Sequence, residues 1–186
     1  MHFQDCLFIT AGTHGCVVKA RDADEGRSVC IKLFRQRWIE SFNQEKTAYE
    51  LLKLAGVEDC IPDVYGYDCR TLVGWGLVEE GEDASDDLYY GIVMEWLEGG
   101  EQVSIDNINL DNACKFIKGL NEIHGAGVLH DDLYLRNIMV LPRSNRAVFV
   151  DFSCAQVSDK FTWEFDIIIR TILSLVLRPF FMADRL

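Results

Sequence analysis

Hydrophobic and polar residues alternate through the first third of the chain in the manner of β-strands. Three such runs, CLFIT, GCVVKA and SVCIKLF, are separated by the turn-like stretches AGTHG and DADEGR. The next stretch, WIESFNQEKTAYELLKLAG, repeats its apolar residues near the helical period, and Gly56 follows where a helix would end. The pattern therefore predicts an antiparallel sheet followed by one helix.

Strand-like and helical patterns continue through the rest of the chain. TLVGWGLV and YYGIVMEWL are predicted as strands on either side of the acidic run EEGEDASDD, which is interpreted as a solvated loop. LDNACKFIKGLNEIH gathers its apolar residues on one helical face, and VLH, NIMVL and AVFVDF follow as short strands. A final helix is expected from about Trp163. The order of elements predicts an α+β fold, in which an N-terminal antiparallel sheet with one helix precedes a mainly helical part.

Composition limits the class of protein without naming a function. Of the 186 residues, 49% are hydrophobic and 26% are charged, which is typical of a globular domain. The formal net charge of -12 argues against a nucleic-acid-binding face. The longest apolar stretch, 165–182, is interrupted by charged residues and is too short to cross a bilayer, so a buried helix and no membrane association are expected.

The seven cysteines form no CxxC pair and show no zinc-ligand spacing with histidine. Their scattered positions, mostly in apolar runs, predict buried free thiols in a reducing, cytoplasmic compartment. The N-terminal stretch MHFQDCLFIT lacks a basic region followed by an apolar run, so no signal peptide is expected. A monomer is the expected state.

One stretch carries more hydrogen-bonding side chains than a solvated loop needs. VLHDDLYLRNIMVL places His130, Asp132 and Asn137 between two strand-like runs, and Asp151 ends the next strand in FVDFS. Phosphoryl transfer needs a carboxylate at the attacking hydroxyl, oxygen ligands for Mg²⁺ and a cation at the phosphates. Asp132 is the candidate catalytic base. Because Mg²⁺ prefers hard oxygen ligands, Asn137 and Asp151 are the candidate metal ligands.

The spacing of these residues resembles the catalytic and metal-binding loops of the protein kinase superfamily. The pattern H-x-D-L-x-x-x-N runs from His130 to Asn137, and D-F-x follows at Asp151 and Phe152. The resemblance implies an ATP- and Mg²⁺-dependent phosphotransferase that moves the γ-phosphate to a hydroxyl, with a Ser/Thr-type protein kinase as the first expectation. It also implies a packed column behind the site, formed by Tyr49, His130 and Phe152.

Upstream stretches supply the other parts that such a protein requires. VCIK is similar to the third-strand lysine motif, which implies that Lys32 binds the α- and β-phosphates and acts with Asp132 and Asn137 in catalysis. Glu45, in the following helix, is the expected catalytic partner of Lys32, and Glu50 is the alternative.

The stretch TAGTHGCV is similar to the glycine-rich loop with its first glycine replaced by threonine, and Gly12 and Gly15 remain. These glycines would allow the backbone to approach the phosphates of ATP. Taken alone, two glycines between strands fit an ordinary hairpin turn better than a phosphate-binding loop.

The resemblance also implies an adenine pocket and a bilobal organisation. IVMEWLEGG is similar to the strand and hinge that join two lobes. The implied organisation is a single kinase-like domain over 1–186, with an N-lobe at about 1–94, a hinge at about 95–100 and a C-lobe at about 101–186. Each apolar member of the implied ATP site also fits a plain core position. The implied ATP-binding residues are Gly12, Gly15, Val17, Cys30, Lys32, Met94, Glu95, Leu97 and Met139.

Several positions depart from the family pattern. Asp131 stands where many protein kinases carry Arg, so regulation through an activation-loop phosphate is not expected. Tyr134 replaces a lysine that touches the γ-phosphate, and Arg136 either supplies that charge or forms a structural salt bridge. Ser153 takes the place of a glycine and is expected to reduce local flexibility. Asp166 is either the buried aspartate of the family's central lower-lobe helix or a helix cap.

Two other functions stay open at this point. Residues 154–186 are all that follow Ser153, which implies a truncated helical C-lobe with almost no activation segment. Aminoglycoside and choline phosphotransferases are similar in having a residue other than Arg between the His and Asp of the loop, so a small-molecule acceptor is one alternative. A catalytically silent nucleotide-binding domain is the other. The expected partners are ATP and an unidentified protein or small-molecule hydroxyl.

Overall fold

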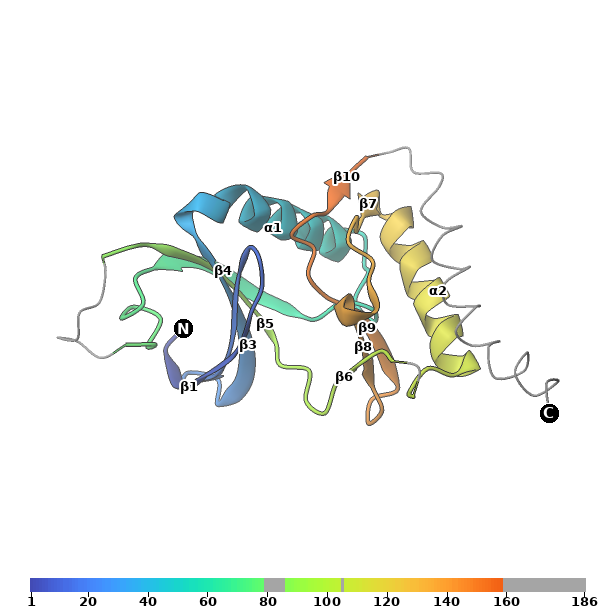
Figure 1. Cartoon of the computed structure of the whole chain (residues 1–186), viewed down its shortest axis with the longest axis horizontal. Helices are drawn as coiled ribbons and strands as arrows, with labels where there is room; N and C mark the ends of the chain where they lie inside the picture. Colours follow the sequence, from blue (N-terminus) through green and yellow to red (C-terminus); the bar gives the residue numbers. More distant parts are fainter. Residues whose placement is uncertain (79–85, 105, 159–186) are drawn as a thin grey trace. The chain divides into compact units, whose positions relative to one another are not determined.

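The chain folds as an α+β protein in the parts that the structure describes, which are residues 1–78, 86–104 and 106–158 of a computed structural model. The N-terminal part forms a five-stranded antiparallel sheet, and few helices occur among the described residues. Figure 1 shows the sheet and helix α1, and, further along the chain, helix α2 with the short strands that follow it. The predicted fold class is confirmed.

The chain divides into two compact units. The first unit is made of Met1–Tyr49 and Pro62–Leu97, and the second of Glu50–Ile61 and the described residues from Glu98 onward. Helix α1 (Ile39–Leu54) therefore contributes residues to both units. The assignment of lobe boundaries within a single kinase-like domain stays a prediction.

The sheet of the first unit has the strand order β1-β2-β3-β5-β4. Its central strand β3 pairs without interruption with β2, from Gly15 opposite Phe34 to Asp22 opposite Arg27. Pairing on both sides fixes the direction in which each β3 side chain points. The five strands are β1 (Phe3–Ala11), β2 (Gly15–Asp22), β3 (Arg27–Arg35), β4 (Val64–Arg70) and β5 (Tyr89–Glu95).

The two faces of this sheet have different coverings. One face packs into the hydrophobic cluster of the first unit. On the other, the ring of Phe42 in helix α1 packs edge-on against Phe34, with centroids 5.8 Å apart, and lies tilted 5.4 Å from Tyr90. Helix α1 follows the short 3-10 turn η1 (Gln36–Trp38) and is anchored to the sheet by these aromatic contacts. The hydrophobic cluster consists of Phe3, Val18, Ala20, Val29, Ile31, Leu33, Trp75 and Val93.

The prediction of a strand at TLVGWGLV is wrong. Residues 71–78 form successive turns, in which the N–H of Trp75 donates to the carbonyl of Thr71 at 3.0 Å. Gly76 adopts a φ of +73°, which favours glycine. The turns place Trp75 in the core at 1% exposure. Gly91 makes room for it, because a Cβ there would lie 2.3 Å from the indole ring.

The second unit combines one long helix with short strands. Helix α2 (Leu110–Gly125) is capped at its N-terminus by Asn109, whose side chain accepts a hydrogen bond from the N–H of Asn112 at 2.9 Å. Strands β6, β8 and β9 form one sheet, and β7 pairs with β10. The bounds are β6 (Glu101–Gln102), β7 (Val128–Leu129), η2 (Leu135–Asn137), β8 (Ile138–Leu141), β9 (Arg146–Phe149) and β10 (Gln156–Val157).

The core of the second unit forms where α2 meets β9 and the segment before β4. Gly119 of α2 permits this approach, because a Cβ there would lie 2.7 Å from the Cβ of Cys60 and 3.1 Å from the ring of Phe149. The N–H of Phe149 donates to the carbonyl of Cys60 at 2.8 Å, and Arg146 donates to the carbonyl of Ile61 at 2.9 Å. These bonds tie strand β9 to a segment that is distant in sequence.

The cysteine prediction is wrong in part. All seven thiols are free, but Cys60 alone among them is buried, and Cys69 and Cys114 are exposed. Cys69 lies on the edge strand β4, and Cys114 lies on the outer face of α2, so neither meets a core among the described residues.

No helix in the described ranges combines the length and apolar character needed to cross a membrane. The helix predicted from Trp163, the apolar stretch 165–182 and the alternatives for Asp166 lie outside the described residues, as do residues 79–85 of the acidic run.

Candidate functional site

Four residues predicted to bind ATP share one face of the sheet in the first unit. Val17 lies opposite Lys32 in the β2–β3 pairing, and Cys30 lies opposite Met94 in the β3–β5 pairing. Residues that are directly opposite, or two apart along a strand, point to the same face. The four side chains therefore lie together, on the face away from the hydrophobic cluster.

Lys32 is held by a buried ion pair with helix α1. Its Nζ lies 2.6 Å from Oε2 of Glu45, and the residues are 8% and 0% exposed. Glu45, and not the exposed Glu50, is thus the residue that meets Lys32 in the structure. Removing both charges from water is costly, and a buried ion pair is often no more stable than two packed apolar residues. The pair is therefore poorly explained by stability alone.

Cys30 adds an apolar lining beside this pair. Burial raises the pKa of its thiol to about 12; the charge of Lys32 opposes the rise, and the carboxylate of Glu45 adds to it. The thiol is therefore protonated at neutral pH and behaves as a small hydrophobic side chain.

The two glycines of the predicted glycine-rich loop differ in their surroundings. The N–H of Gly12 donates to the carbonyl of Gly15 at 2.8 Å and closes the turn between β1 and β2. A Cβ on Gly15 would lie 2.2 Å from the carbonyl oxygen of Leu33, so strand pairing itself requires glycine there. Nothing lies within 4 Å of the position a Cβ would take on Gly12. Gly12 is therefore the glycine whose backbone a phosphate could approach.

The predicted hinge residues begin at the end of β5. Met94 is buried at 5% exposure, and Leu97 is half-buried. The N–H of Glu95 donates to the carbonyl of Asp63 at 2.8 Å, and its carboxylate accepts from the N–H of Asp63 at 3.3 Å. The backbone N–H of Glu95 is thus engaged within the protein and is not a donor that adenine would use.

The candidate base Asp132 is fixed by hydrogen bonds from its own loop. Nη2 of Arg136 lies 3.0 Å from both carboxylate oxygens. Nδ2 of Asn137 donates to Oδ2 and to the backbone carbonyl of Asp132, each at 2.8 Å. Of the two roles considered for Arg136, the salt bridge is present in the structure. Arg136 also lies over the ring of the exposed Tyr134, 4.2 Å from its centroid.

His130 fastens this loop to the segment that precedes Asp151. The side chain is fully buried, and its Nε2 lies 3.0 Å from the carbonyl of Val150. Its ring centroid lies 4.5 Å from that of Phe152. His130 and Phe152 are therefore packed together as the resemblance implied. Tyr49 is buried in the first unit, and its membership of the column stays a prediction.

The two candidate metal ligands lie at the same end of the β8–β9 hairpin. Ile138 is opposite Phe149, and the N–H of Val150 donates to the carbonyl of Asn137 at 2.9 Å. Asn137 therefore belongs to the last rung of the hairpin, and Asp151 follows Val150 of the same rung directly. Since Nδ2 of Asn137 donates to Asp132, its amide oxygen is the end of the side chain that a metal would use. The third residue of interest on this hairpin, Met139, is half-buried opposite Val148.

The donor set fits Mg²⁺ in chemical type. An amide oxygen from Asn137 and a carboxylate from Asp151 are hard oxygen ligands, and Mg²⁺ in proteins is usually completed by substrate phosphates and water. No group of three or more His, Cys, Asp or Glu residues within the described ranges is arranged to hold a metal by itself. Mg²⁺ binding here would therefore require further oxygen ligands besides these two side chains.

Sequence reasoning did not find Gln156 or Cys154 at this end of the unit, nor the contact that Ser153 makes. Nε2 of Gln156 donates to Asp131 at 2.6 Å, and the hydroxyl of Ser153 donates to Asp151. Burial raises the pKa of the Cys154 thiol, and the carboxylates of Asp132 and Asp151 add to the rise. The contact of Gln156 depends on the pairing of β10 with β7, so no local signal in the sequence could have revealed it.

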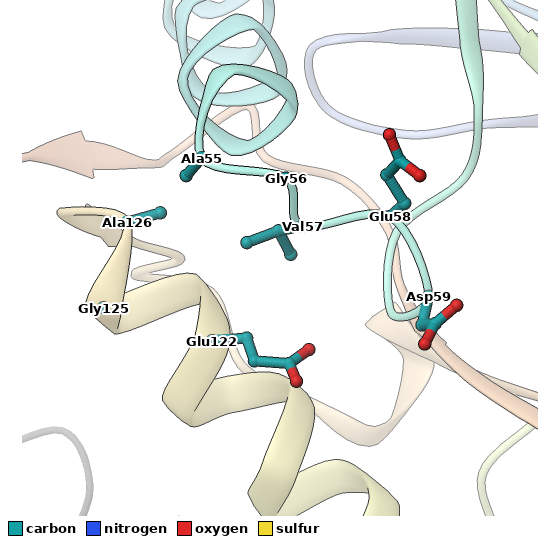
Figure 2. A pocket seen from close by; sticks show the side chains of 8 residues that line it. All are labelled: Ala55, Gly56, Val57, Glu58, Asp59, Glu122, Gly125 and Ala126. Atoms are coloured by element: carbon teal, nitrogen blue, oxygen red, sulfur yellow. The ribbon is translucent and has the colours of Figure 1, made fainter.

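A separate hollow of about 410 Å³ lies in the second unit where the ends of α1 and α2 approach each other (Figure 2). Its three acidic side chains, Glu58, Asp59 and Glu122, point in different directions and do not converge on one point (Figure 2). None of the predicted site residues lines it. The hollow is therefore distinct from the residues discussed above.

Curated protein kinases are similar to the chain over most of its length. The serine/threonine-protein kinase pkn3 of Myxococcus xanthus is 29% identical over 161 residues, which cover 81% of this chain and 27% of that protein. The stress-activated protein kinase jnk-1 of Caenorhabditis elegans is 28% identical over 84% of this chain and 33% of its own length. For mitogen-activated protein kinase 12 of Mus musculus the identity is 27%, over 84% and 42% of the two chains.

No protein-family model matches the chain. The chain spans between about a quarter and two fifths of the length of these relatives. Low identity to several protein kinases over most of the chain, and an α+β fold with a five-stranded antiparallel sheet, together support one assignment: a divergent protein-kinase-like domain.

Proposed function

We propose that the chain is the kinase-like part of an ATP- and Mg²⁺-dependent phosphotransferase that acts on a protein hydroxyl. The relatives named above are protein kinases, which supports a phosphotransferase of this class. The observation that carries the proposal is the buried pair of Lys32 and Glu45 on the same sheet face as Val17, Cys30 and Met94. A fixed ammonium beside apolar side chains suits a ligand with a flat base and charged phosphates.

Each residue set has a distinct part in this proposal. Lys32, held by Glu45, binds the α- and β-phosphates. Asn137 and Asp151 would hold Mg²⁺, which when bound neutralises charge on the phosphates. The adenine ring would be lined by Val17, Cys30, Met94, Leu97 and Met139, with Gly12 and Gly15 over the phosphates. The action of residues from both units on one nucleotide is part of the proposal and is tested below.

Asp132 acts on the acceptor. Its carboxylate orients the attacking hydroxyl and takes its proton as the bond from the acceptor oxygen to the γ-phosphorus forms and the bond to the β-phosphate oxygen breaks. ADP leaves with the electron pair of the broken bond. Arg136 and Asn137 hold the Asp132 carboxylate in one orientation, so the base does not have to be ordered when the acceptor binds.

The proposal is tested by Asp132→Asn in a transfer assay with labelled ATP, Mg²⁺ and generic protein substrates. The variant is expected to lose about 10²–10⁴-fold in transfer rate, because a positioned base contributes roughly this much. Stabilisation of the protein by Mg·ATP should persist in the variant. Asp106→Asn, an exposed aspartate of the same unit, is the control and should transfer phosphate at the parent rate.

Equal transfer by Asp132→Asn and the parent would show that the base is misassigned. Stabilisation of the parent by Mg·ATP with no turnover on any acceptor would instead support the catalytically silent alternative. A panel of amines and sugars run in the same assay separates the small-molecule acceptor from the protein acceptor, because turnover would then occur without protein substrate.

A further inference from the structure

Asp151 has a backbone conformation that few residues other than glycine adopt. Its φ is +66°, in the left-handed region. Aspartate is among the residues that tolerate this region, because its short side chain can hydrogen-bond to the backbone nearby. The residues that follow it, Phe152 and Ser153, are 0% and 4% exposed. The turn at Asp151 is therefore built into the interior of the second unit.

Ser153 donates twice to one oxygen of Asp151. Its hydroxyl lies 2.5 Å from Oδ1, and its backbone N–H lies 3.3 Å from the same atom. Such a side-chain-to-backbone turn holds both the backbone and the carboxylate. Rotation of the carboxylate would break this part-buried hydroxyl bond, at a cost in free energy. A glycine at 153 would provide the N–H but not the hydroxyl.

We propose that Ser153 is a positioning residue, which fixes the Asp151 carboxylate in the orientation that it presents to Mg²⁺, a role that rests on the proposed function. Groups that hydrogen-bond to a metal ligand set its direction and its basicity, and their removal commonly weakens metal binding by about 10–100-fold. A serine at 153 thus lacks the backbone freedom of a glycine and fixes the orientation of the Asp151 carboxylate. The metal site of this chain would need less ordering when nucleotide and metal arrive.

The experiment compares Ser153→Ala and Ser153→Gly with the parent by thermal unfolding at saturating ATP and increasing Mg²⁺. Each variant removes the hydroxyl and keeps the backbone N–H. The Mg²⁺ concentration that gives half of the maximal shift is expected to rise about tenfold in both variants. The maximal shift at high Mg²⁺ should be restored, because the ligands themselves are intact.

Ser104→Ala is the matched control. The hydroxyl oxygen of Ser104 accepts a hydrogen bond from the N–H of Asp106 at 3.3 Å, so it also serves a local turn beside an aspartate in the same unit. Its Mg²⁺ midpoint should stay within about twofold of the parent.

Two outcomes overturn the inference, and they are distinguishable. If the parent shows a Mg²⁺-dependent shift and a folded Ser153 variant has the same midpoint, Ser153 has only a structural role and the proposed function stands. If the parent itself shows no Mg²⁺-dependent shift with ATP, the proposed function fails and the role of Ser153 fails with it. A lower unfolding temperature of the ligand-free Ser153 variants, with an unchanged midpoint, belongs to the first outcome.

Discussion

Two ion pairs, one in each unit, both bring a cation within hydrogen-bonding distance of a carboxylate, but they differ in their exposure to water. Lys32 and Glu45 meet at 2.6 Å with side chains 11% and 0% exposed, whereas Arg136 and Asp132 meet at 3.0 Å with side chains 55% and 22% exposed. A buried pair pays a large desolvation penalty, and an exposed pair is screened by water and contributes about 0–1 kcal/mol. Geometry alone therefore does not say what a charged pair contributes.

Because the two pairs differ in burial, mutations in the two units should have different effects on stability and activity. In the first unit the charge that would meet the phosphates is part of the folded interior, so its loss should affect folding and binding together. In the second unit the carboxylate that would meet the acceptor sits on a half-exposed loop held by local bonds. Changes there should affect chemistry while leaving the fold intact.

The largest expected effect is that of Glu45→Ala. The change removes the carboxylate that compensates the buried ammonium of Lys32, so the free energy of unfolding should fall by about 3–5 kcal/mol. Urea unfolding of the purified variant measures this. Glu50→Ala, on the exposed side of the same helix, is the control and should change the free energy by less than about 0.5 kcal/mol. Equal effects of the two changes would remove the contrast between the buried and the exposed pair.

Replacing both members of the buried pair sharpens the same comparison. Lys32→Met with Glu45→Leu should leave stability unchanged or raise it by up to about 4 kcal/mol, while Mg·ATP binding is lost. Thermal unfolding with and without Mg·ATP gives both results. A double variant that still binds Mg·ATP as the parent does would contradict the role given to Lys32.

An intermediate effect is expected from Cys30, which lies beside the buried pair. Its pKa is about 12 when folded, against a usual value near 9, so above pH 9 the unfolded thiol ionises while the folded thiol stays protonated. Stability gained from the neutral thiol is present below about pH 9 and is lost as pH rises towards 12. From pH 8 to pH 10 the parent should therefore lose about 1–2 kcal/mol of its free energy of unfolding relative to Cys30→Val. Cys69→Val, at an exposed thiol, is the control, and a pH-independent difference for Cys30→Val would contradict the raised pKa of this thiol.

The smallest expected effect on stability is that of Arg136→Ala. Because the pair with Asp132 is exposed, the free energy of unfolding should fall by less than about 1 kcal/mol. The turnover rate should fall while the KM for ATP is unchanged, because Asp132 loses a bond that orients it. Lys118→Ala breaks another exposed i,i+4 pair, with Glu122 at 3.4 Å, and should have a similarly small effect on stability while leaving the turnover rate unchanged. A loss of several kcal/mol in Arg136→Ala would show that this pair, too, is structural.

Local sequence patterns were sufficient for most elements, and the resemblance to the protein kinase superfamily supplied the expected pairing partner of Lys32. Strands β1 to β3 and both long helices follow from alternation and helical period, and Glu45 falls one turn after Phe42 on the buried face of α1. The strand predicted at TLVGWGLV failed because the glycines there form turns, while the true strand β4, VYGYDCR, carries a glycine and two charges that disguise it.

Contacts that depend on register or on an unusual dihedral angle could not be predicted. The common face of Val17, Cys30 and Met94 follows from the pairing of three strands, which the sequence does not specify. The bond between Ser153 and Asp151 requires the left-handed conformation of Asp151, and replacing glycine by serine suggested only reduced flexibility. The sequence motifs therefore predicted which residues matter, but not how their side chains are arranged in space.

The central claim is that Lys32 of the first unit and Asp151 of the second act on the same nucleotide. A double-mutant cycle on the dissociation constant of Mg·ATP, with Lys32→Met, Asp151→Asn and both together, measures this by calorimetry. Sites that share a ligand should be coupled by about 0.5–3 kcal/mol, so the double variant should lose less than the sum of the single losses. Losses that add to within about 0.3–0.5 kcal/mol would mean that the two residues act independently, and would contradict a shared nucleotide.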